Sequence, residues 1–256
     1  MSSPLNNPNS NRALAVVIPM YNEEEGATRC VREVCNFISA NVPSCRLFVV
    51  DDGSRDQTGR ILAQLKTAEP SLPFEIISCK ENHGYGAALL AGAQAAERAG
   101  YAFALFMDSD LTNPPAMIRT FYDIAASGRY DLIKASRYIP GGGMKGVPWI
   151  RRIFSNTGNK IASFLFSMGL HDCTNGFRAV RLELLRDICF KERGFPSILE
   201  ELYHLKRKTS RVTEVPSILT ARQKGEGVSK FHYNLNTIFG YLKYAIKARL
   251  LKENTH

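Results

Sequence analysis

In the first 110 residues, short apolar runs alternate with longer segments that carry apolar residues on one helical face. Each run is bounded by polar, glycine or proline residues, which is typical of a buried strand. The predicted strands cover residues 14–18, 47–50, 74–78 and 101–107. The predicted helices cover residues 23–40, 58–68 and 86–99. Strands that alternate with helices predict an α/β fold with a mostly parallel sheet flanked by helices, and we expect Pro19 to end the first strand.

After residue 110 the pattern is less regular. Glycine and proline cluster over residues 140–148, where we expect a mobile loop that covers a ligand. The remaining predicted elements are helices over 150–168, 197–207 and 235–251 and a strand over 211–215. We therefore expect a flexible polar tail over residues 1–12, one α/β domain over 13–233 and a basic, amphipathic C-terminal helix within 234–256.

Charge and cysteine content narrow the classes of protein. The formal net charge is +9, and from Arg222 onward seven basic residues face two acidic ones. Such a bias suits nucleic acid, an anionic membrane or phosphorylated ligands. The six cysteines include no C-x-x-C pair, so we expect reduced thiols in a reducing compartment and no zinc site. Apolar runs fall short of the roughly 18 residues that span a bilayer.

Carboxylates follow several of the predicted strands. Asp51 and Asp52 follow the second strand, and Asp108 and Asp110 follow the fourth. Each could cap a helix N-terminus, but together they lie where α/β folds bind ligands. In extended backbone Asp108 and Asp110 leave the same side, so one Mg²⁺ or Mn²⁺ could bridge them on a nucleoside diphosphate. No P-loop is present, and Leu89 stands where a dinucleotide fingerprint needs its third glycine.

The ordered set of motifs resembles the family-two glycosyltransferases of GT-A fold and, more narrowly, the polyprenyl-phosphate sugar synthases. The first group of motifs is Val16-Val17-Ile18-Pro19, Tyr21-Asn22-Glu23, Asp51-Asp52-Gly53-Ser54, Asn82-His83-Gly84-Tyr85-Gly86 and Asp108-Ser109-Asp110-Leu111. The second group is Ser136-Arg137-Tyr138, Arg151-Arg152 with Ser155, Asp172-Cys173-Thr174-Asn175-Gly176-Phe177-Arg178, and Arg222 with Ser229-Lys230. The resemblance covers nearly the whole chain after residue 12 and implies that residues 13–233 form the catalytic domain.

The resemblance also implies roles for matched positions. Donor-nucleotide contacts would come from Pro19, Tyr21, Glu23, Asp52, Gly84 and Asp108. The metal would bind Asp108 and Asp110, and catalysis would depend on Asp110, Arg137, Arg151 and Arg222. The acceptor phosphate would bind Arg137, Arg151, Ser155 and Arg222. Family members usually carry Gln where this chain has Thr112, which leaves the third metal contact open.

The implied activity is inverting transfer of a hexose, most simply mannose, from GDP-mannose or a UDP-hexose to a polyprenyl or dolichyl phosphate. A phosphate monoester is largely a dianion at neutral pH, so it needs no general base. One alternative acceptor is a sugar hydroxyl or lipid-linked saccharide, which would need a carboxylate base. Another alternative is a non-catalytic nucleotide-sugar or membrane-binding protein. We expect no nucleic-acid partner. We expect a cytoplasmic enzyme that binds peripherally to the cytoplasmic face of an anionic membrane. A membrane-anchoring partner subunit is a further candidate partner.

The C-terminal helix and three single residues carry further expectations. One apolar stripe is predicted along the helix at Leu235, Ile238, Phe239, Leu242, Ile246 and Leu250. This stripe suits either a helix packed on the domain or one that lies on a membrane. We interpret His83 and His171 as ordinary loop histidines. Glu200 is read as an exposed helix residue, with its role left open.

Overall fold

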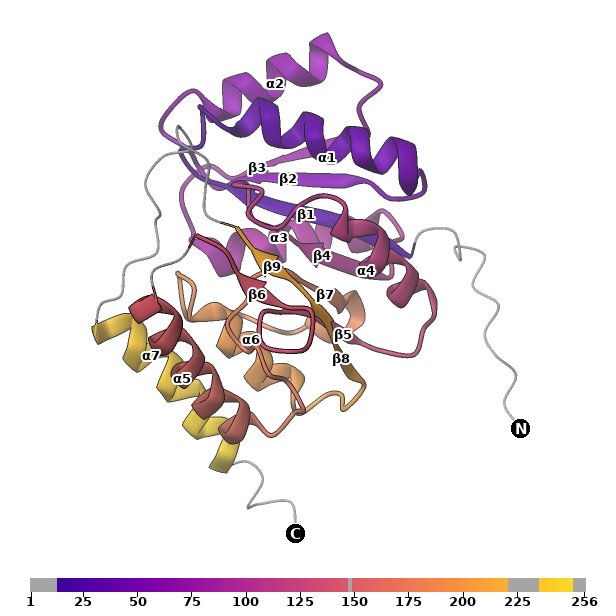
Figure 1. Cartoon of the computed structure of the whole chain (residues 1–256). Coiled ribbons are helices and arrows are strands. Elements are labelled where there is room, and N and C mark those ends of the chain that lie inside the picture. Colours follow the sequence, from indigo (N-terminus) through magenta and orange to yellow (C-terminus); the bar gives the residue numbers. More distant parts are fainter. Residues whose placement is uncertain (1–12, 147–148, 221–234, 251–256) are drawn as a thin grey trace.

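The computed structural model describes residues 13–146, 149–220 and 235–250. For residues 149–154 and 235–242 the description covers the backbone and not the side chains. Within these ranges the main sheet has seven strands in the order β3-β2-β1-β4-β7-β5-β8 (Figure 1). Its strands are β1 (Leu14–Met20), β2 (Leu47–Asp51), β3 (Phe74–Ser78), β4 (Phe103–Phe106), β5 (Leu132–Ser136), β7 (Arg178–Arg181) and β8 (Val212–Pro216). Only β7 runs antiparallel to its neighbours in this sheet, so the predicted mostly parallel sheet is confirmed.

Helices cover both faces of the sheet. They are α1 (Ala27–Asn41), α2 (Thr58–Ala68), α3 (Tyr85–Arg98), α4 (Met117–Ala126), α5 (Trp149–Phe166), α6 (Ser197–Leu205) and α7 (Leu235–Leu250). One core joins α1, α2 and α4 to the sheet residues Val16 and Ile18. The other joins α3, α5, α6 and α7 to Ala15 and Val17. The alternation of side chains along β1 therefore supplies both cores and holds three layers together.

The first half of the chain folds close to its prediction. α2 and β3 have the predicted bounds, and the ends of β2 and α3 differ by one residue. The prediction that Pro19 ends the first strand is wrong, because β1 continues to Met20. Pairing of β1 with β4 stops at Val17, whereas pairing with β2 continues to Met20. The missing N–H of Pro19 faces the β4 side, so it ends only that ladder.

The second half contains elements that the sequence reading did not assign. α4 places Ile118, Phe121 and Ala125 in the core at spacings of three and four, which is a readable helical signal. β5 was hidden because a lysine, Lys134, interrupts its apolar run. The predicted loop over 140–148 contains the short strand β6 (Gly143–Met144), which pairs with β9 (Ile218–Leu219). Residues 147–148 lie outside the described ranges.

Helix α7 lies beside α5 at the edge of the molecule (Figure 1). Among the described side chains of α7, the buried ones are Tyr244, Ala245 and Ala248, which pack into the core shared with α3 and α6. Two members of the predicted stripe, Ile246 and Leu250, are instead 50% and 55% exposed. These two members of the stripe therefore do not lie on the face that packs on the domain, and the members before residue 243 lie outside the described side chains. Among the described residues, we find no helix long and apolar enough to cross a bilayer.

Candidate active site

The segments that follow β1 and β2 are joined by hydrogen bonds at the carboxyl edge of the sheet. The backbone N–H of Asn22 donates to Ser54 Oγ at 3.0 Å, and Arg55 N–H donates to Asn22 Oδ1 at 2.8 Å. Glu23 N–H donates to the Thr58 hydroxyl at 2.8 Å. Because these bonds cross between the two loops, the predicted donor residues after β1 and those after β2 form one surface.

Asp52 is a buried carboxylate that orders the loop before α3. Its Oδ1 accepts from His83 N–H at 2.9 Å, and its Oδ2 accepts from Gly84 N–H at 2.8 Å. The side-chain amide of Asn82 also donates to Oδ2, at 3.1 Å. Three neutral N–H donors fix this carboxylate without neutralising its charge. The structure thus brings together Asp52 and Gly84, two of the residues predicted to contact the donor.

Asp108 lies just beyond the end of β4 and Asp110 lies in the turn that follows, so the two do not share one extended strand as we expected. Asp108 Oδ1 accepts from the Tyr85 hydroxyl at 3.2 Å. Asp110 Oδ1 accepts from the backbone N–H and the hydroxyl of Thr112, at 3.1 and 2.9 Å. The residue at the usual Gln position therefore orients Asp110 directly. Partly exposed carboxylate oxygens at this edge suit Mg²⁺ or Mn²⁺, which bind through one or two carboxylates, waters and substrate phosphates.

A fully buried ion pair lies behind Asp108. Arg178 donates to both carboxylate oxygens of Glu201, at 2.5 and 2.7 Å, and to the carbonyl oxygen of Gly176 at 2.8 Å. A Cβ at Gly176 would lie 3.2 Å from the Tyr85 hydroxyl and 3.3 Å from Asp108 Oδ2. Burial, followed by the charge of Asp108, raises the pKa of Tyr85 well above its usual value, so the phenol keeps the proton that it donates.

Sequence reasoning assigned Arg178 to a motif but gave it no role, and it missed Glu201. The reason is that the pair joins β7 to α6 across 23 residues. Burial works against the charge of Arg178, but Glu201 outweighs it, so the pKa of Arg178 is raised. The pair and the packed glycine position Tyr85, and through it Asp108.

The predicted acceptor residue Arg137 is already engaged by a carboxylate. It donates to both oxygens of Asp172, at 2.6 and 2.8 Å, and to the Thr174 hydroxyl at 2.9 Å. Burial works to raise the pKa of Asp172, but the Arg137 guanidinium lowers it below the ordinary range. The structure therefore brings the Ser-Arg-Tyr motif against the Asp-Cys-Thr-Asn motif, and Arg137 is not an isolated phosphate ligand.

Ser155 reaches the same region from α5. Its hydroxyl lies 2.7 Å from the hydroxyl of Tyr138, the residue after Arg137. Asn159, one turn later, donates to Thr174 Oγ1 at 2.9 Å and accepts from Cys173 N–H at 2.9 Å. Two of the four predicted acceptor residues are thus placed together. Arg151 lies in the first turn of α5 with its side chain outside the description, and Arg222 lies outside the described residues.

Several alternative readings can now be decided. In α1 to α4 no N-cap residue makes a side-chain cap hydrogen bond, and none of the four carboxylates Asp51, Asp52, Asp108 and Asp110 is an N-cap residue of these helices. His171 is an exposed histidine that lies 2.7 Å from a carboxylate oxygen of Glu214, which fits an ordinary surface role. For Glu200, whose role was left open, the ordinary alternative of an exposed helix residue does not hold. This residue is 1% exposed and accepts from the backbone N–H groups of Lys191 and Glu192.

The comparisons with known proteins agree with this geometry. Residues 15–189 match the family Glycosyl transferase family 2. The chain belongs to this family. It is 32% identical over 238 residues to the polyprenol monophosphomannose synthase of Mycolicibacterium smegmatis, which covers 92% of this chain and 88% of that relative.

A second relative, the dolichol-phosphate mannosyltransferase of Pyrococcus furiosus, is 29% identical over 93% of this chain, which spans 64% of that protein. The undecaprenyl-phosphate mannosyltransferase of Micrococcus luteus is 28% identical, over 82% of this chain and 84% of that protein. The predicted identity as a family-two glycosyltransferase is therefore confirmed.

Solved structures confirm the fold. Glucosyl-3-phosphoglycerate synthase from Mycobacterium tuberculosis, crystallised with Mn²⁺, UDP and glucosyl-3-phosphoglycerate, superposes with a TM-score of 0.64 at 19% identity. The match covers 97% of this chain and 86% of that one. A further structure of the same enzyme contains Mg²⁺ and UDP and gives a TM-score of 0.63. The glycosyltransferase described here thus has the GT-A fold that the motifs predicted.

Proposed function

We propose that this glycosyltransferase transfers mannose from a nucleotide sugar to a polyprenyl phosphate. The observation that carries the proposal is the meeting of two groups of motifs at one edge of the sheet. Gly176, in the segment that also carries Asp172, packs against Asp108, so the arginine region adjoins the carboxylates after β4. The names of the three mannosyltransferase relatives support the substrate class.

On the donor side, the chain would bind the nucleotide diphosphate along the joined loops after β1 and β2. Asp108 and Asp110 would hold a divalent ion there, oriented by Tyr85 and Thr112. When bound, Mg²⁺ or Mn²⁺ supplies positive charge that stabilises a leaving diphosphate. The residues themselves contribute fixed geometry, since their hydrogen-bond donors are already in place before a donor arrives.

On the acceptor side, Arg137 would exchange part of its pairing with Asp172 for the phosphate. A guanidinium offers five N–H donors, and its planar fork matches phosphate as it matches a carboxylate. The Asp172 side chain is fully buried, so its carboxylate stays beside Arg137 when the phosphate binds. It would limit how tightly Arg137 grips the phosphate, which would leave a phosphate oxygen nucleophilic enough to attack the sugar. Arg151, Ser155 and Arg222 remain predicted partners in this step.

A surface patch on α5 and α7 would hold the enzyme at the membrane that contains its acceptor. The patch consists of Ile161, Phe164, Ile246 and Leu250, which are 45%, 69%, 50% and 55% exposed. The side chain of Arg249 lies over the Phe164 ring, 5.4 Å from its centroid. Apolar side chains beside basic ones are typical of surfaces that lie on anionic lipid. Bound in this way, the enzyme would be a peripheral protein at the membrane surface.

The test is a product assay in which GDP-mannose, UDP-mannose, GDP-glucose and UDP-glucose are each supplied with Mn²⁺ to the full chain. Each donor is paired with a short-chain polyprenyl phosphate, the corresponding free polyprenol, and a polyprenyl-diphosphate-linked saccharide. Of the three acceptors, we expect only the polyprenyl phosphate to give a product, a polyprenyl glycosyl phosphate detected by mass spectrometry. We expect a mannose donor to be preferred. Transfer to the alcohol or the saccharide would establish the hydroxyl-acceptor alternative instead.

A further inference from the structure

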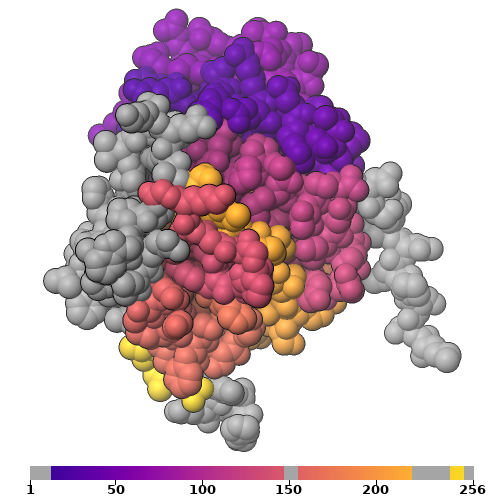
Figure 2. All heavy atoms as spheres, viewed as in Figure 1, coloured from indigo at the N-terminus to yellow at the C-terminus, as the bar shows by residue number. Residues whose placement is uncertain are grey.

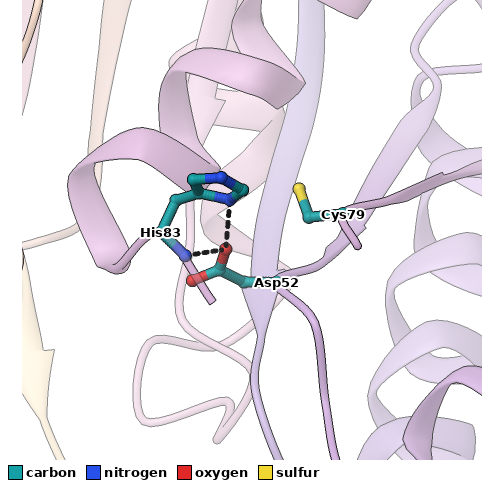
Figure 3. A group of neighbouring side chains, drawn as sticks. All are labelled: Asp52, Cys79 and His83. Carbon is teal, nitrogen blue, oxygen red and sulfur yellow. Dashed lines mark hydrogen bonds and ion pairs between the residues drawn. The ribbon is translucent and has the colours of Figure 1, made fainter. Parts of the chain in front are cut away.

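Three different metal-binding side chains meet at the carboxyl ends of β2 and β3. Figure 3 shows Asp52, Cys79 and His83 pointing toward one another. One ligand atom from each residue lies within 4.8 Å of the others, and Asp52 Oδ1 is 3.9 Å from His83 Nδ1. We propose that Asp52, Cys79 and His83 form a site for Zn²⁺ or a similar thiolate-binding divalent ion, separate from the Asp108 and Asp110 pair.

Strand register explains why the cluster was invisible in the sequence. Asp51 pairs with Ser78 in the parallel ladder between β2 and β3. The next residues, Asp52 and Cys79, are therefore side by side on one face, although 27 positions apart in the sequence. The spacing rules that argue against a C-x-x-C zinc site do not apply to residues that are joined in this way.

The loop before α3 fixes the third ligand. Its backbone is tied to Asp52 through His83 N–H and Gly84 N–H. It also packs tightly against Gly53, whose φ is +65° and where a Cβ would lie 2.4 Å from the backbone of Glu81. The His83 side chain is 56% exposed, so the imidazole can turn while its backbone stays fixed.

The ligand chemistry favours zinc over magnesium. Zinc accepts sulfur, nitrogen and oxygen ligands, and open sites combine three protein ligands with a water or another exchangeable group. Ligand atoms in such tetrahedra are about 3.5 Å apart, so the cluster needs a contraction of roughly 1 Å. Among the described residues, the partners of the Asp52 carboxylate are N–H donors and the His83 imidazole, with no lysine or arginine. The carboxylate thus keeps its charge for a cation.

Binding has a simple chemical balance. The Cys79 S–H bond breaks, a sulfur–metal bond forms, and the proton leaves to solvent, with no change of oxidation state. Because sulfur binds the metal as thiolate, an ion with high affinity for thiolate displaces this proton most readily. The site is therefore selective for ions with high affinity for thiolate.

Occupation of the site would regulate the enzyme. This consequence rests on the proposed function, in which Asp52 contacts the donor nucleotide. A metal bound to the Asp52 carboxylate would occupy the position that the nucleotide needs, so metal and nucleotide would exclude one another. A soft divalent ion would then be a competitive inhibitor of the donor, whereas Mg²⁺ or Mn²⁺ at Asp108 and Asp110 would support turnover.

The test uses Co²⁺ as a spectroscopic substitute for Zn²⁺ in the full chain. A thiolate bound to Co²⁺ gives a near-ultraviolet charge-transfer band, which an all-oxygen site at Asp108 and Asp110 cannot give. We expect the band in the wild type, its loss on stoichiometric Zn²⁺, and no band in Cys79→Ser. His83→Ala should weaken Co²⁺ binding more than about tenfold, since even outer-shell partners of a metal contribute that much. Cys189→Ser, which removes an exposed thiol elsewhere, should keep the band.

Two outcomes would overturn the site: no band in the wild type, or a band that persists in Cys79→Ser. Thermal melting of each variant shows that it is folded, and the exposed His83 provides a second substitution that does not disturb the core. UDP and GDP are then added separately without Mg²⁺. Loss of the band with either nucleotide supports mutual exclusion. A band that persists at saturating nucleotide leaves the metal site standing and contradicts the placement of the nucleotide at Asp52.

Discussion

The two halves of the active site hold their carboxylates in different ways. In the half formed after β1, β2 and β4, Asp52 and Asp110 accept hydrogen bonds from backbone N–H groups and a hydroxyl. In the other half, guanidinium groups clamp the buried carboxylates Asp172 and Glu201. Figure 2 shows the N-terminal part of the chain, in indigo and purple, at one end of the visible face and the second half at the other.

The difference between neutral donors and guanidinium partners suggests how each half would bind its substrate. The N–H and O–H donors that bond to Asp52 and Asp110 orient these carboxylates without cancelling their charge, which suits the approach of a cation. In the second half Arg137 is already paired with the buried carboxylate of Asp172, so an anionic ligand that binds Arg137 must compete with a carboxylate that cannot move away. We infer that the donor half is preorganised and that the acceptor half exchanges partners on binding.

The largest expected effect comes from breaking the buried pair of Arg178 and Glu201. Glu201→Ala leaves an uncompensated buried guanidinium, which typically costs about 3–5 kcal/mol of unfolding free energy. Urea denaturation measures the loss. The double variant Arg178→Met/Glu201→Leu removes both charges and should recover most of the stability. If the pair also positions Tyr85, that folded double variant should still show a raised donor KM. A normal donor KM would limit the pair to a structural role.

Asp110→Asn should have the next largest effect, on turnover. Loss of a metal ligand removes several kcal/mol of charge stabilisation, so kcat/KM should fall by roughly a hundredfold or more. Initial rates with Mn²⁺ and a nucleotide sugar provide the measurement. Asp123→Asn is the matched control, because Asp123 is an exposed carboxylate on α4 that pairs with Arg119. Full activity of Asp110→Asn in excess chelator would show that the donor half needs no metal.

Membrane binding should depend on exposed apolar residues rather than on the whole C-terminal helix. Truncation would remove Tyr244, Ala245 and Ala248 from the core, so it cannot separate folding from membrane binding. Ile246→Ser/Leu250→Ser leaves that face intact and should weaken binding to anionic liposomes by about 30-fold, since each apolar side chain contributes on the order of 1 kcal/mol. Co-sedimentation measures the binding, and an unchanged melting temperature is the control. Undiminished co-sedimentation of the variant would show that these apolar residues do not bind the membrane.

Much of the first half could be predicted because its signals are local. β3 and α2 match their predicted bounds because the spacing of apolar residues within each element and the turn residues beside it are both local in the sequence. In the second half the deciding contacts are between distant segments. The helix α6 and its position were predicted, but nothing local shows that Glu200 accepts backbone bonds while Glu201 pairs with Arg178. The partner of Arg137 was missed for the same reason, because Asp172 is 35 residues away.

The smallest expected effect is a pH dependence of stability at Lys134. This lysine is fully buried and donates to the carbonyl oxygen of Asn175 at 2.9 Å. Burial, together with the charge of Arg178, lowers the pKa of Lys134 from 10.5 to about 8. Between these values the unfolded chain binds a proton that the folded chain lacks, so folding gains stability as pH rises through this window.

Lys134→Met should remove that gain. Compared with the wild type, the variant should lose about 1–2 kcal/mol of relative unfolding free energy between about pH 7.5 and pH 9.5. Parallel urea titrations at the two pH values measure the difference, and titration of all other groups cancels in the comparison. A difference that does not change with pH would mean that Lys134 stays charged in the folded protein.

The division of labour between the two halves is tested most directly by the kinetics of Arg137 variants with each substrate varied in turn. Arg137→Gln removes a charged hydrogen bond worth roughly 1.5–3 kcal/mol, so the KM for polyprenyl phosphate should rise about ten- to a hundredfold. The KM for the nucleotide sugar should stay within about twofold of the wild type, given that the donor residues are held independently.

The double variant Arg137→Gln/Asp172→Asn separates this effect from stability in the same measurement. It leaves neither member of the pair as an uncompensated charge, so it should melt closer to the wild type than Arg137→Gln does. We expect the acceptor KM to stay high in the double variant, while the donor KM stays at the wild-type value. A raised donor KM with an unchanged acceptor KM would contradict the assignment of Arg137 to the acceptor phosphate, and with it the separation of the two halves.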